Sequence, residues 1–347
     1  MTLKNFKFKI VMLTLIIMTL IVMVLAVGQG AVKVSLPDIL QVFYVKIFGI
    51  NNHEITPLTM NIVWNLRLPR VLIGFFVGAG LSVSGVAMQS IVKNPMADPF
   101  VLGVASGAGF FATLGLIFGV FSFLGTYALP ISAFLGAFIS LLIVLAFTHV
   151  FKRVSLLEIL LIGIVVSMIF DAATRYVILS APNALGIHNT EFWMAGSLVN
   201  AKWDYFWIPI SICTIIIVII WFNYKNLALL SLGEDQAREL GINVNRKRFE
   251  MIVLISLLTG IIISLSGVVG FIGMICPHLA RKLVGGNLVK VIPTAIFVGG
   301  LFVIVSDILA RVLIAPVELP LGLLTALFGG PIFLFIFIFK GNGRVRA

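Results

Sequence analysis

Ten apolar runs separated by short polar connections limit how this chain can fold. A helix needs about 20 apolar residues to cross a bilayer, and backbone groups in lipid are satisfied only within helices or closed barrels. Charged residues make up 11% of the chain, against roughly 25% in soluble domains. The sequence therefore predicts one all-α, polytopic membrane domain over residues 1–347 with about ten transmembrane helices. The expected spans are 10–27, 70–91, 101–119, 127–150, 157–180, 205–222, 249–265, 269–284 (short), 291–313 and 321–340.

The first run also has features of a secretory signal peptide. Three lysines precede it, and small residues such as Ala26 lie near its end. It is longer than the roughly 7–15 residues of a signal-peptide core, which favours an uncleaved first span. Residues 28–66 contain Pro37 and Pro57, and we expect them to form an external loop before the main core of the membrane domain at 67–340.

The distribution of Lys and Arg predicts the orientation in the membrane. With the N-terminus in the cytoplasm, the inside segments carry 17 of the 24 basic residues and the outside segments carry 7. Cytoplasmic loops of membrane proteins have this excess, and an even number of spans places both termini on the cytoplasmic side. A net charge of +11 would suggest a nucleic-acid partner in a soluble protein. Here the topology accounts for the charge, so we expect no nucleic-acid partner.

A polar stretch at 231–248 interrupts the apolar runs and is predicted to lie in the cytoplasm. Gly233 breaks the preceding run, Glu234 favours a helix N-terminus, and Gly241 is placed as a C-terminal stop. Arg238 follows Glu234 at i+4, the order that supports an ion pair on a helix. The pattern predicts a helix of about two turns.

A helix this short is unstable alone in water, so either the rest of the chain or a partner must hold it. Ala237 and Leu240 are three residues apart and form a small apolar face that suits a partner's groove. The alternative interpretation is an ordinary solvated loop between two spans.

Four arginines are predicted on the outer face, where the orientation rule disfavours positive charge, and three of them stand in short motifs. Arg67 and Arg70 open the second span, and Arg311 lies near the end of the ninth, four residues after Asp307. Such arginines can pair within their own helix or anchor to phosphate headgroups. They can also present guanidinium groups to carboxylates of an external protein.

The sequence contains no pattern of residues that is typical of a catalytic site or a metal site. Cys276-Pro277-His278 places a thiol near an imidazole, but no second ligand pair lies nearby, so a helix broken by proline is the better interpretation. Cys213 and Cys276 both lie in apolar runs, which argues against a disulfide framework. The G-x-x-x-x-G-K-[ST] signature of an ATP-binding loop does not occur. We therefore expect no metal site, no bound cofactor and no enzyme activity.

Five sequence motifs stand in the order and at the spacing of one membrane-protein family, from about residue 60 to residue 340. They are Arg67-Leu68-Pro69-Arg70, the run from Gly85 to Gly107, Leu232-Gly233-Glu234 with Ala237-Arg238 and Leu240-Gly241, Gly270-Phe271-Ile272-Gly273 with Pro277-His278, and Asp307-Ile308-Leu309-Ala310-Arg311 followed by Glu318-Leu319-Pro320-Leu321-Gly322. The chain resembles the permease subunits of type II ATP-binding-cassette (ABC) importers. That family takes up iron–siderophore complexes, haem and cobalamin.

The resemblance implies a ten-span permease in the bacterial plasma membrane that pairs with a second permease chain, identical or related, around a central pathway. It also implies that the stretch at 231–248 contains the coupling helix, which docks in a cleft of the ATPase subunit. The residues that match this coupling helix are Gly233, Glu234, Asp235, Ala237, Arg238, Leu240 and Gly241.

Two further sites are implied by the same resemblance. Arg67, Arg70 and Arg311 would receive glutamates of an extracytoplasmic substrate-binding protein. Ser155, Leu156 and Leu157 would lie at the cytoplasmic gate, although relatives often have more small hydroxyl residues there. ATP and Mg would be bound by two partner ATPase subunits.

The implied function is ATP-driven uptake of ferric siderophore complexes, with haem or cobalamin as the alternative cargo. An ion-coupled secondary transporter is a second class, but it needs an unpaired carboxylate deep in the bilayer. Glu158, the nearest candidate, lies close to the predicted cytoplasmic surface. An intramembrane enzyme is a third class, and it lacks clustered His, Asp or Glu at metal-ligand spacing.

Overall fold

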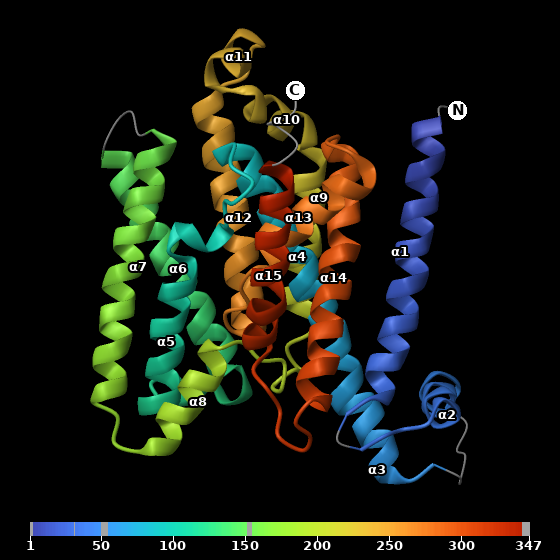
Figure 1. Ribbon diagram of the computed structural model, residues 1–347. Helices are drawn as coiled ribbons and strands as arrows, with labels where there is room; N and C mark the ends of the chain where they lie inside the picture. The colour runs from blue at the N-terminus through green and yellow to red at the C-terminus, as the bar shows by residue number, and fades with distance from the viewer. Residues whose placement is uncertain (1–2, 31, 50–54, 151–154, 342–347) are drawn as a thin grey trace.

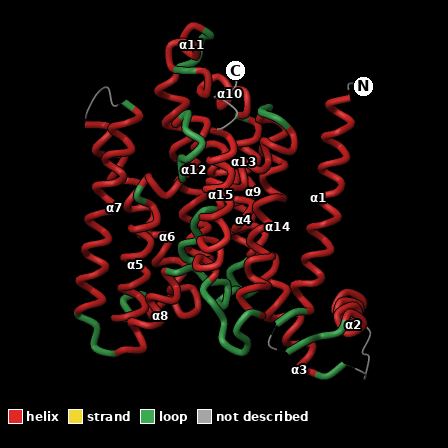
Figure 2. The backbone as a smooth tube through the Cα atoms, viewed as in Figure 1, coloured by secondary structure: helices red, strands yellow, loops and turns green. Residues whose placement is uncertain are grey.

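A computed structural model describes residues 3–30, 32–49, 55–150 and 155–341, and within these ranges the chain is helical with no strand (Figures 1 and 2). The prediction of an all-α membrane protein is confirmed. The α-helices are α1 (Leu3–Gly28), α2 (Leu36–Phe48), α3 (Pro57–Met60), α4 (Leu68–Val92), α5 (Val104–Phe118), α6 (Ala128–Val150), α7 (Leu156–Leu179), α8 (Ala184–Met194), α9 (Trp207–Phe222), α10 (Tyr224–Leu232), α11 (Glu234–Glu239), α12 (Val244–Ser266), α13 (Ile272–Val284), α14 (Leu288–Val312) and α15 (Leu321–Gly341). A π-helix, η1 (Asn61–Arg67), joins α3 to α4, and short 3-10 segments are η2 (Pro99–Leu102) and η3 (Ser122–Tyr127).

Each of the ten predicted spans falls on a helix, although not every helix is long enough to cross a bilayer by itself. In the described residues, six helical segments have the length and apolarity of a span, and α9 with α10, bent by 56°, make a seventh if the pair is counted as one broken span. The apolar helix α5 has 15 residues and α13 has 13, whereas α15 has 21. The count of ten transmembrane helices therefore stays a prediction.

The expectation that residues 28–66 are loop-like is wrong in conformation. This segment contains α2, α3 and the start of a continuous helical stretch that runs into α4. Pro37 and Pro57 stand in the first turns of α2 and α3, where a missing N–H costs nothing. Ser35 and Thr56 cap these helices by accepting hydrogen bonds from backbone N–H groups. The two prolines mark helix starts rather than a loop.

The helix α4 is the most buried span and forms the centre of the bundle. It packs against α12, α13 and α14, and small residues permit close approach. A Cβ atom on Gly78 would lie 2.1 Å from the carbonyl oxygen of Gly299 on α14. Gly107 of α5 and Gly136 of α6 make an equivalent contact, with 2.4 Å from a Cβ on Gly107 to the Gly136 carbonyl oxygen. Close glycine contacts of this kind hold helices together in lipid, where apolar burial gives no preference for the partner helix.

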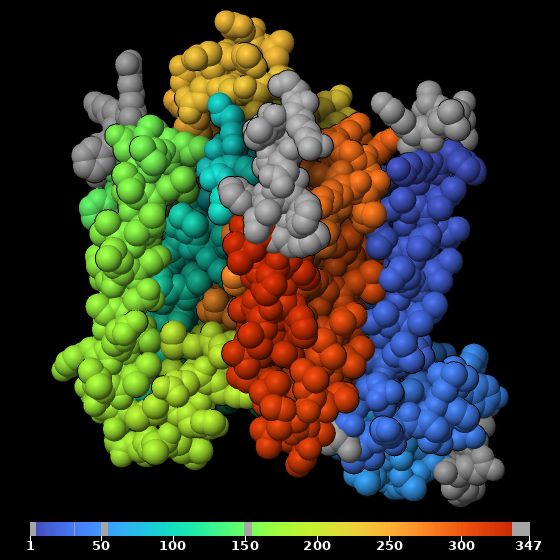
Figure 3. Space-filling view, viewed as in Figure 1, coloured from blue at the N-terminus to red at the C-terminus, as the bar shows by residue number. Residues whose placement is uncertain are grey.

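The two ends of the bundle differ. The start of α1, the end of α15 and the short helix α11 lie at one end, and α11 projects beyond the other helices (Figures 1 and 3). The helices α2 and α3 lie at the opposite end (Figure 1). This arrangement agrees with the charge-based prediction that both termini and the 231–248 stretch share one side of the membrane.

Candidate functional sites at the two ends of the bundle

The helix α11 is held to the bundle by a buried arginine. Glu234 accepts a hydrogen bond from the guanidinium of Arg248 on α12, and the Arg248 side chain is only 6% exposed. Glu234 also pairs with Arg238 at 3.5 Å, which is the i, i+4 pair predicted from the sequence. A helix this short needs contacts from outside itself, and Arg248 of the same chain supplies one of them.

The C-terminal end of α11 has the predicted glycine stop. Gly241 adopts a left-handed conformation with φ +83°. The Gly241 N–H donates to the Arg238 carbonyl at 2.9 Å, and the Ile242 N–H donates to the Ala237 carbonyl at 3.1 Å. These two bonds form a Schellman motif, which satisfies carbonyl groups that a helix end leaves open. The end of α11 is thus fixed before any partner binds.

The predicted apolar face of Ala237 and Leu240 is not a single exposed surface. Ala237 is 0% exposed and packs within the chain, whereas Leu240 is 60% exposed. The i+3 spacing is correct, but burial of the small alanine against the bundle turns that side of the helix inward. Asp235, Gln236, Arg238 and Glu239 remain exposed with Leu240, so the free surface of α11 is polar and charged around one leucine.

The end of the central helix α4 reaches the start of α11. Lys93 follows α4 in a left-handed conformation, and its Nζ atom lies 3.3 Å from the position of a Cβ on Gly233. The position of Lys93 thus brings the end of α4 beside the start of α11.

In the turn that follows Lys93, the Asp98 carboxylate accepts a hydrogen bond from the Phe100 N–H at 2.8 Å. Burial raises the pKa of the Asp98 carboxyl, and this hydrogen bond opposes the rise. The Asp98 contact lies within its own turn.

Replacing Glu234 by glutamine is expected to loosen α11, because buried Arg248 loses its carboxylate partner. The partly exposed pair is worth on the order of 1 kcal/mol, or about fivefold in local opening. Amide hydrogen exchange over residues 233–242 measures this opening. Arg238→Gln is the control, since it removes only the exposed partner and should change exchange by less than about twofold. Equal effects of the two variants would contradict the role of Arg248.

At the opposite end, buried charges join α4, α14 and the connection to α15. Arg70 pairs with Asp307 at 2.8 Å and with Glu318 at 2.9 Å. Asp307 also pairs with Arg311 at 3.1 Å, an i, i+4 pair predicted from the sequence. The side chains of Asp307 and Arg311 are nearly inaccessible, while Glu318 is one-third exposed. Glu318 is therefore the member of this network that solvent reaches most easily.

Backbone carbonyls at the end of α1 and in the connection to α2 accept hydrogen bonds from Arg67 and Arg311. Arg67 donates to the Val27 carbonyl at 2.8 Å and to the Gly28 carbonyl at 3.0 Å, and it also contacts the Val32 carbonyl. Arg311 donates to the Gln29 carbonyl at 2.7 Å. Backbone carbonyls of Val27, Gly28, Gln29 and Val32 thus satisfy the two guanidinium groups.

Arg67, Arg70 and Arg311 are all buried in the conformation described here, and Arg311 makes the pair within its own helix that was one of the alternatives. Their charge is satisfied by Asp307 and Glu318 and by four backbone carbonyls that follow α1 or end it. Contact with a substrate-binding protein remains a prediction, and it requires these internal contacts to open or the partner to reach Glu318 first.

The predicted gate lies at the start of α7. Ser155 caps this helix in a reciprocal arrangement: its hydroxyl accepts from the Glu158 N–H, and its own N–H donates to the Glu158 carboxylate at 2.6 Å. Leu156 is half-buried and Leu157 is exposed. Glu158, considered above as a proton carrier, thus has a capping role. The structure contains one chain, so a constriction between two permease chains stays a prediction.

Two partners in these sites were not assigned from the sequence. Arg248 lies 14 residues from Glu234, and Glu318 lies 248 residues from Arg70. Both residues stand in polar segments noted above, so their presence was visible but their pairing was not. The four carbonyl groups that accept hydrogen bonds from Arg67 and Arg311 belong to the backbone. The pattern of side chains in the sequence therefore does not reveal them.

A bundle of long apolar helices with a projecting polar helix at one end is the architecture of an integral membrane protein. Residues 17–339 match the FecCD transport family. The chain belongs to the FecCD transport family, whose members are permease subunits of ABC transporters. It is therefore an ABC importer permease, and catalysis is not the role of such subunits.

Known relatives cover most of the chain. The molybdate import system permease protein MolB of Haemophilus influenzae is 34% identical over 311 residues, which is 89% of each chain. The Fe(3+) dicitrate transport system permease protein FecD of Escherichia coli is 34% identical over 279 residues, 80% of this chain and 85% of FecD. A solved structure described as an inward-facing metal-chelate type ABC transporter has 32% identity and a TM-score of 0.81. The match covers 95% of this chain and 98% of that one.

Proposed function

We propose that this chain is the permease of an importer that carries a ferric siderophore complex inward across the bacterial plasma membrane. Two such chains, identical or related, form the pathway, and Ser155, Leu156 and Leu157 contribute to its cytoplasmic gate. A substrate-binding protein delivers the complex at the end that carries Arg67, Arg70 and Arg311. Two ATPase subunits bind ATP and Mg and engage α11 at the other end.

The observation that carries this proposal is the construction of α11. The helix is fixed internally by Arg248 and by its Schellman motif, yet Leu240 is 60% exposed among polar and charged side chains. A preformed helix with one exposed apolar anchor loses little conformational entropy on docking, which favours recognition by a groove. Because α11 is joined to α12 and lies beside the end of α4, a displacement of α11 is transmitted into the bundle.

ATP changes the transport state only if the ATPase subunits bind the two permease conformations with different free energies. The contacts of α11 supply such a difference when ATP draws the two ATPase subunits together. The Glu234–Arg248 pair then acts as the rigid attachment through which the force reaches α12. This is the coupling step that the proposal assigns to the chain.

The cargo is proposed from relatives rather than from a binding site in this chain. One relative is named for Fe(3+) dicitrate and another for molybdate, so the same fold accompanies different cargoes. The 29 phenylalanines suit a large, partly apolar chelate, which favours a siderophore complex over an oxyanion. Haem and cobalamin, which are also large and partly apolar, remain the alternatives.

Reconstituted transport tests this function. The permease, its ATPase and its binding protein are placed in sealed liposomes, and uptake is measured for ferric siderophores, haem, cobalamin and molybdate. We expect uptake of a ferric siderophore that needs ATP and the binding protein and survives an uncoupler. Uptake of haem, cobalamin or molybdate but not of a ferric siderophore would change the proposed substrate, and the chain would still belong to an ATP-driven importer. Uptake driven by a proton gradient without ATP would overturn the class.

A further inference from the structure

The helix α2 has an exposed apolar stripe that the transport function does not use. Its residues recur at i, i+4, i+8 and i+11, so they lie on one face of the helix. Leu40 and Ile47 are 60% and 65% exposed. The whole stripe consists of Leu36, Leu40, Tyr44, Ile47 and Phe48.

Two other faces of α2 have different surroundings. Ile39 and Val42 are buried in an apolar cluster with residues of α1, α4 and α14. Asp38 and Gln41 lie on the side that separates this packed face from the stripe. A helix with one face against protein, one polar face and one exposed apolar face fits the edge of a membrane protein, where protein, water and lipid meet.

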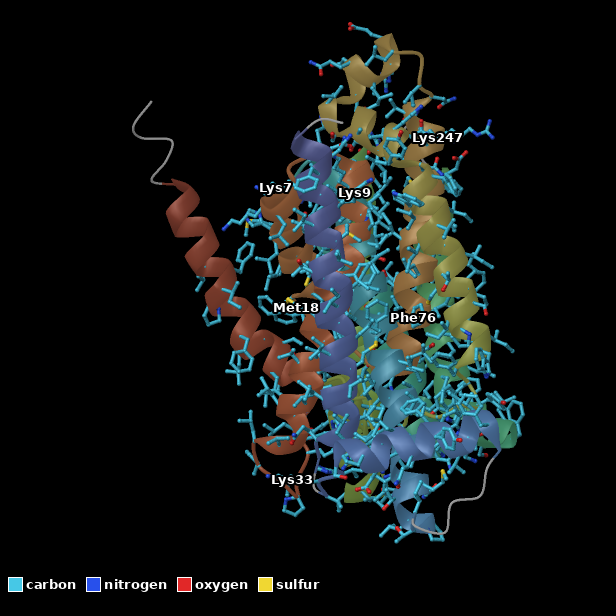
Figure 4. The ribbon with its side chains drawn as sticks, turned by 90° about the vertical axis from the view of Figure 1, so that its right-hand side faces the viewer. Lys7, Lys9, Met18, Lys33, Phe76 and Lys247 are labelled. Atoms are coloured by element: carbon cyan, nitrogen blue, oxygen red, sulfur yellow. The ribbon has the colours of Figure 1, made fainter. Side chains whose placement is uncertain are left out.

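The orientation and position of α2 agree with such a location. It lies across the foot of α1 rather than along it (Figure 4), and it stands at the outer edge of the bundle (Figure 1). An apolar groove of about 500 Å³ runs between the two helices and is lined by Leu20 and Val24 of α1 and by Leu36 and Ile39 of α2. The stripe is thus continuous with the apolar outer surface of α1, a helix that has the length and hydropathy of a membrane span.

Aromatic residues mark the depth of α2 in the membrane. Phe43 of α2 packs edge-on against Trp64 with 5.9 Å between ring centroids, and Trp64 lies 5.9 Å from Trp203. Trp203 in turn stacks at 6.2 Å on Trp207, which is exposed. Lys46 lies 5.9 Å from the Trp64 ring centroid. Tryptophan, tyrosine and lysine gather at the boundary between hydrocarbon and water, which places α2 at that boundary.

We propose that α2 is an in-plane membrane helix whose Leu36–Phe48 stripe inserts into the outer leaflet of the bilayer. The stripe binds lipid acyl chains, and the polar side of α2 faces water. Membrane contact at this point also holds the adjoining turn at 27–32, whose carbonyls cover Arg67 and Arg311. The proposal concerns a lipid surface and does not depend on the cargo.

Quenching of a fluorescent probe tests the proposal on the full-length chain. Leu40→Cys and Ile47→Cys place an environment-sensitive probe on the stripe, and Gln41→Cys places it on the polar side. Cys213 and Cys276 are buried, and the unsubstituted chain gives the background labelling. The labelled chains are measured in phosphatidylcholine nanodiscs that contain either nitroxide-labelled acyl chains or none, and separately with iodide in the water.

We expect the lipid nitroxide to lower emission about twofold at positions 40 and 47 and much less at position 41, because only the stripe enters the leaflet. Iodide should quench position 41 more than the other two. Strong iodide quenching with no lipid quenching at 40 and 47 would show a water-facing stripe and overturn the proposal. Protection from both quenchers at 40 and 47 would show a covering protein surface and would also overturn it.

Discussion

Replacing Leu240 by aspartate is expected to abolish ATP-dependent uptake while leaving the chain folded in the membrane. Leu240 is the exposed apolar residue of α11, beside Asp235 and Glu239. A charge there would be buried without a partner when the helix enters a groove. Loss of a central anchor costs at least about 2 kcal/mol, which weakens ATPase binding by roughly 30-fold.

Co-purification of the ATPase and uptake into liposomes measure this effect. Aspartate near a helix C-terminus is also unfavourable for the helix itself, so Leu240→Asn serves as an uncharged second variant and should show a smaller loss in the same direction. Gln236→Ala is the matched control on the same exposed surface and should bind the ATPase normally. If the Leu240→Asp variant bound the ATPase as tightly as the wild type does, α11 would not be part of the surface that docks on the ATPase.

Replacing Asp307 by asparagine is expected to destabilise the chain strongly. The Asp307 carboxylate lies between the guanidinium groups of Arg70 and Arg311, at 2.8 Å and 3.1 Å, and its side chain is 3% exposed. Removing one member of a buried ion pair leaves uncompensated charge, at a cost of roughly 3 kcal/mol. The variant should unfold at a temperature several degrees below that of the wild type.

Cys213 and Cys276 provide the measurement, because both thiols are buried and react with a thiol dye only when the bundle opens. Glu318→Gln is the control: its side chain is one-third exposed, and Arg70 keeps Asp307, so the loss should be about 1 kcal/mol or less. If both variants melted alike, the network would not be centred on Asp307.

The buried network also changes how the docking arginines should be tested. Charge reversal at Arg67 or Arg311 would place a carboxylate among backbone carbonyls, so a loss of binding-protein docking would be confounded by instability. Glu318 is the more accessible member of the network. A conservative change at Glu318 therefore separates docking from folding better than a change at either arginine.

The helices were predictable where local chemistry determines them. Apolar runs located the helices that correspond to the ten predicted spans, and glycine positions located both ends of α11. The segment at 28–66 was misjudged because Pro37 and Pro57 are compatible both with loops and with the first turn of a helix. Capping by Ser35 and Thr56 decides in favour of the helix, together with burial of Ile39 and Val42 against distant spans.

The sites were predictable only at short range. The Glu234–Arg238 and Asp307–Arg311 pairs follow from helical spacing, and both are present. The partners Arg248 and Glu318 depend on how separate helices pack, which spacing alone does not determine. The burial of Ala237 follows from the same packing, and it leaves Leu240 as the exposed anchor.

The central claim is that α11 lies on the cytoplasmic side and meets the ATPase there. A cysteine in place of Leu240 can be treated with a membrane-impermeant maleimide in sealed right-side-out and inside-out vesicles. We expect the maleimide to modify this cysteine only in inside-out vesicles, and we expect the purified ATPase subunit to protect it when added first. Modification in right-side-out vesicles would contradict this claim.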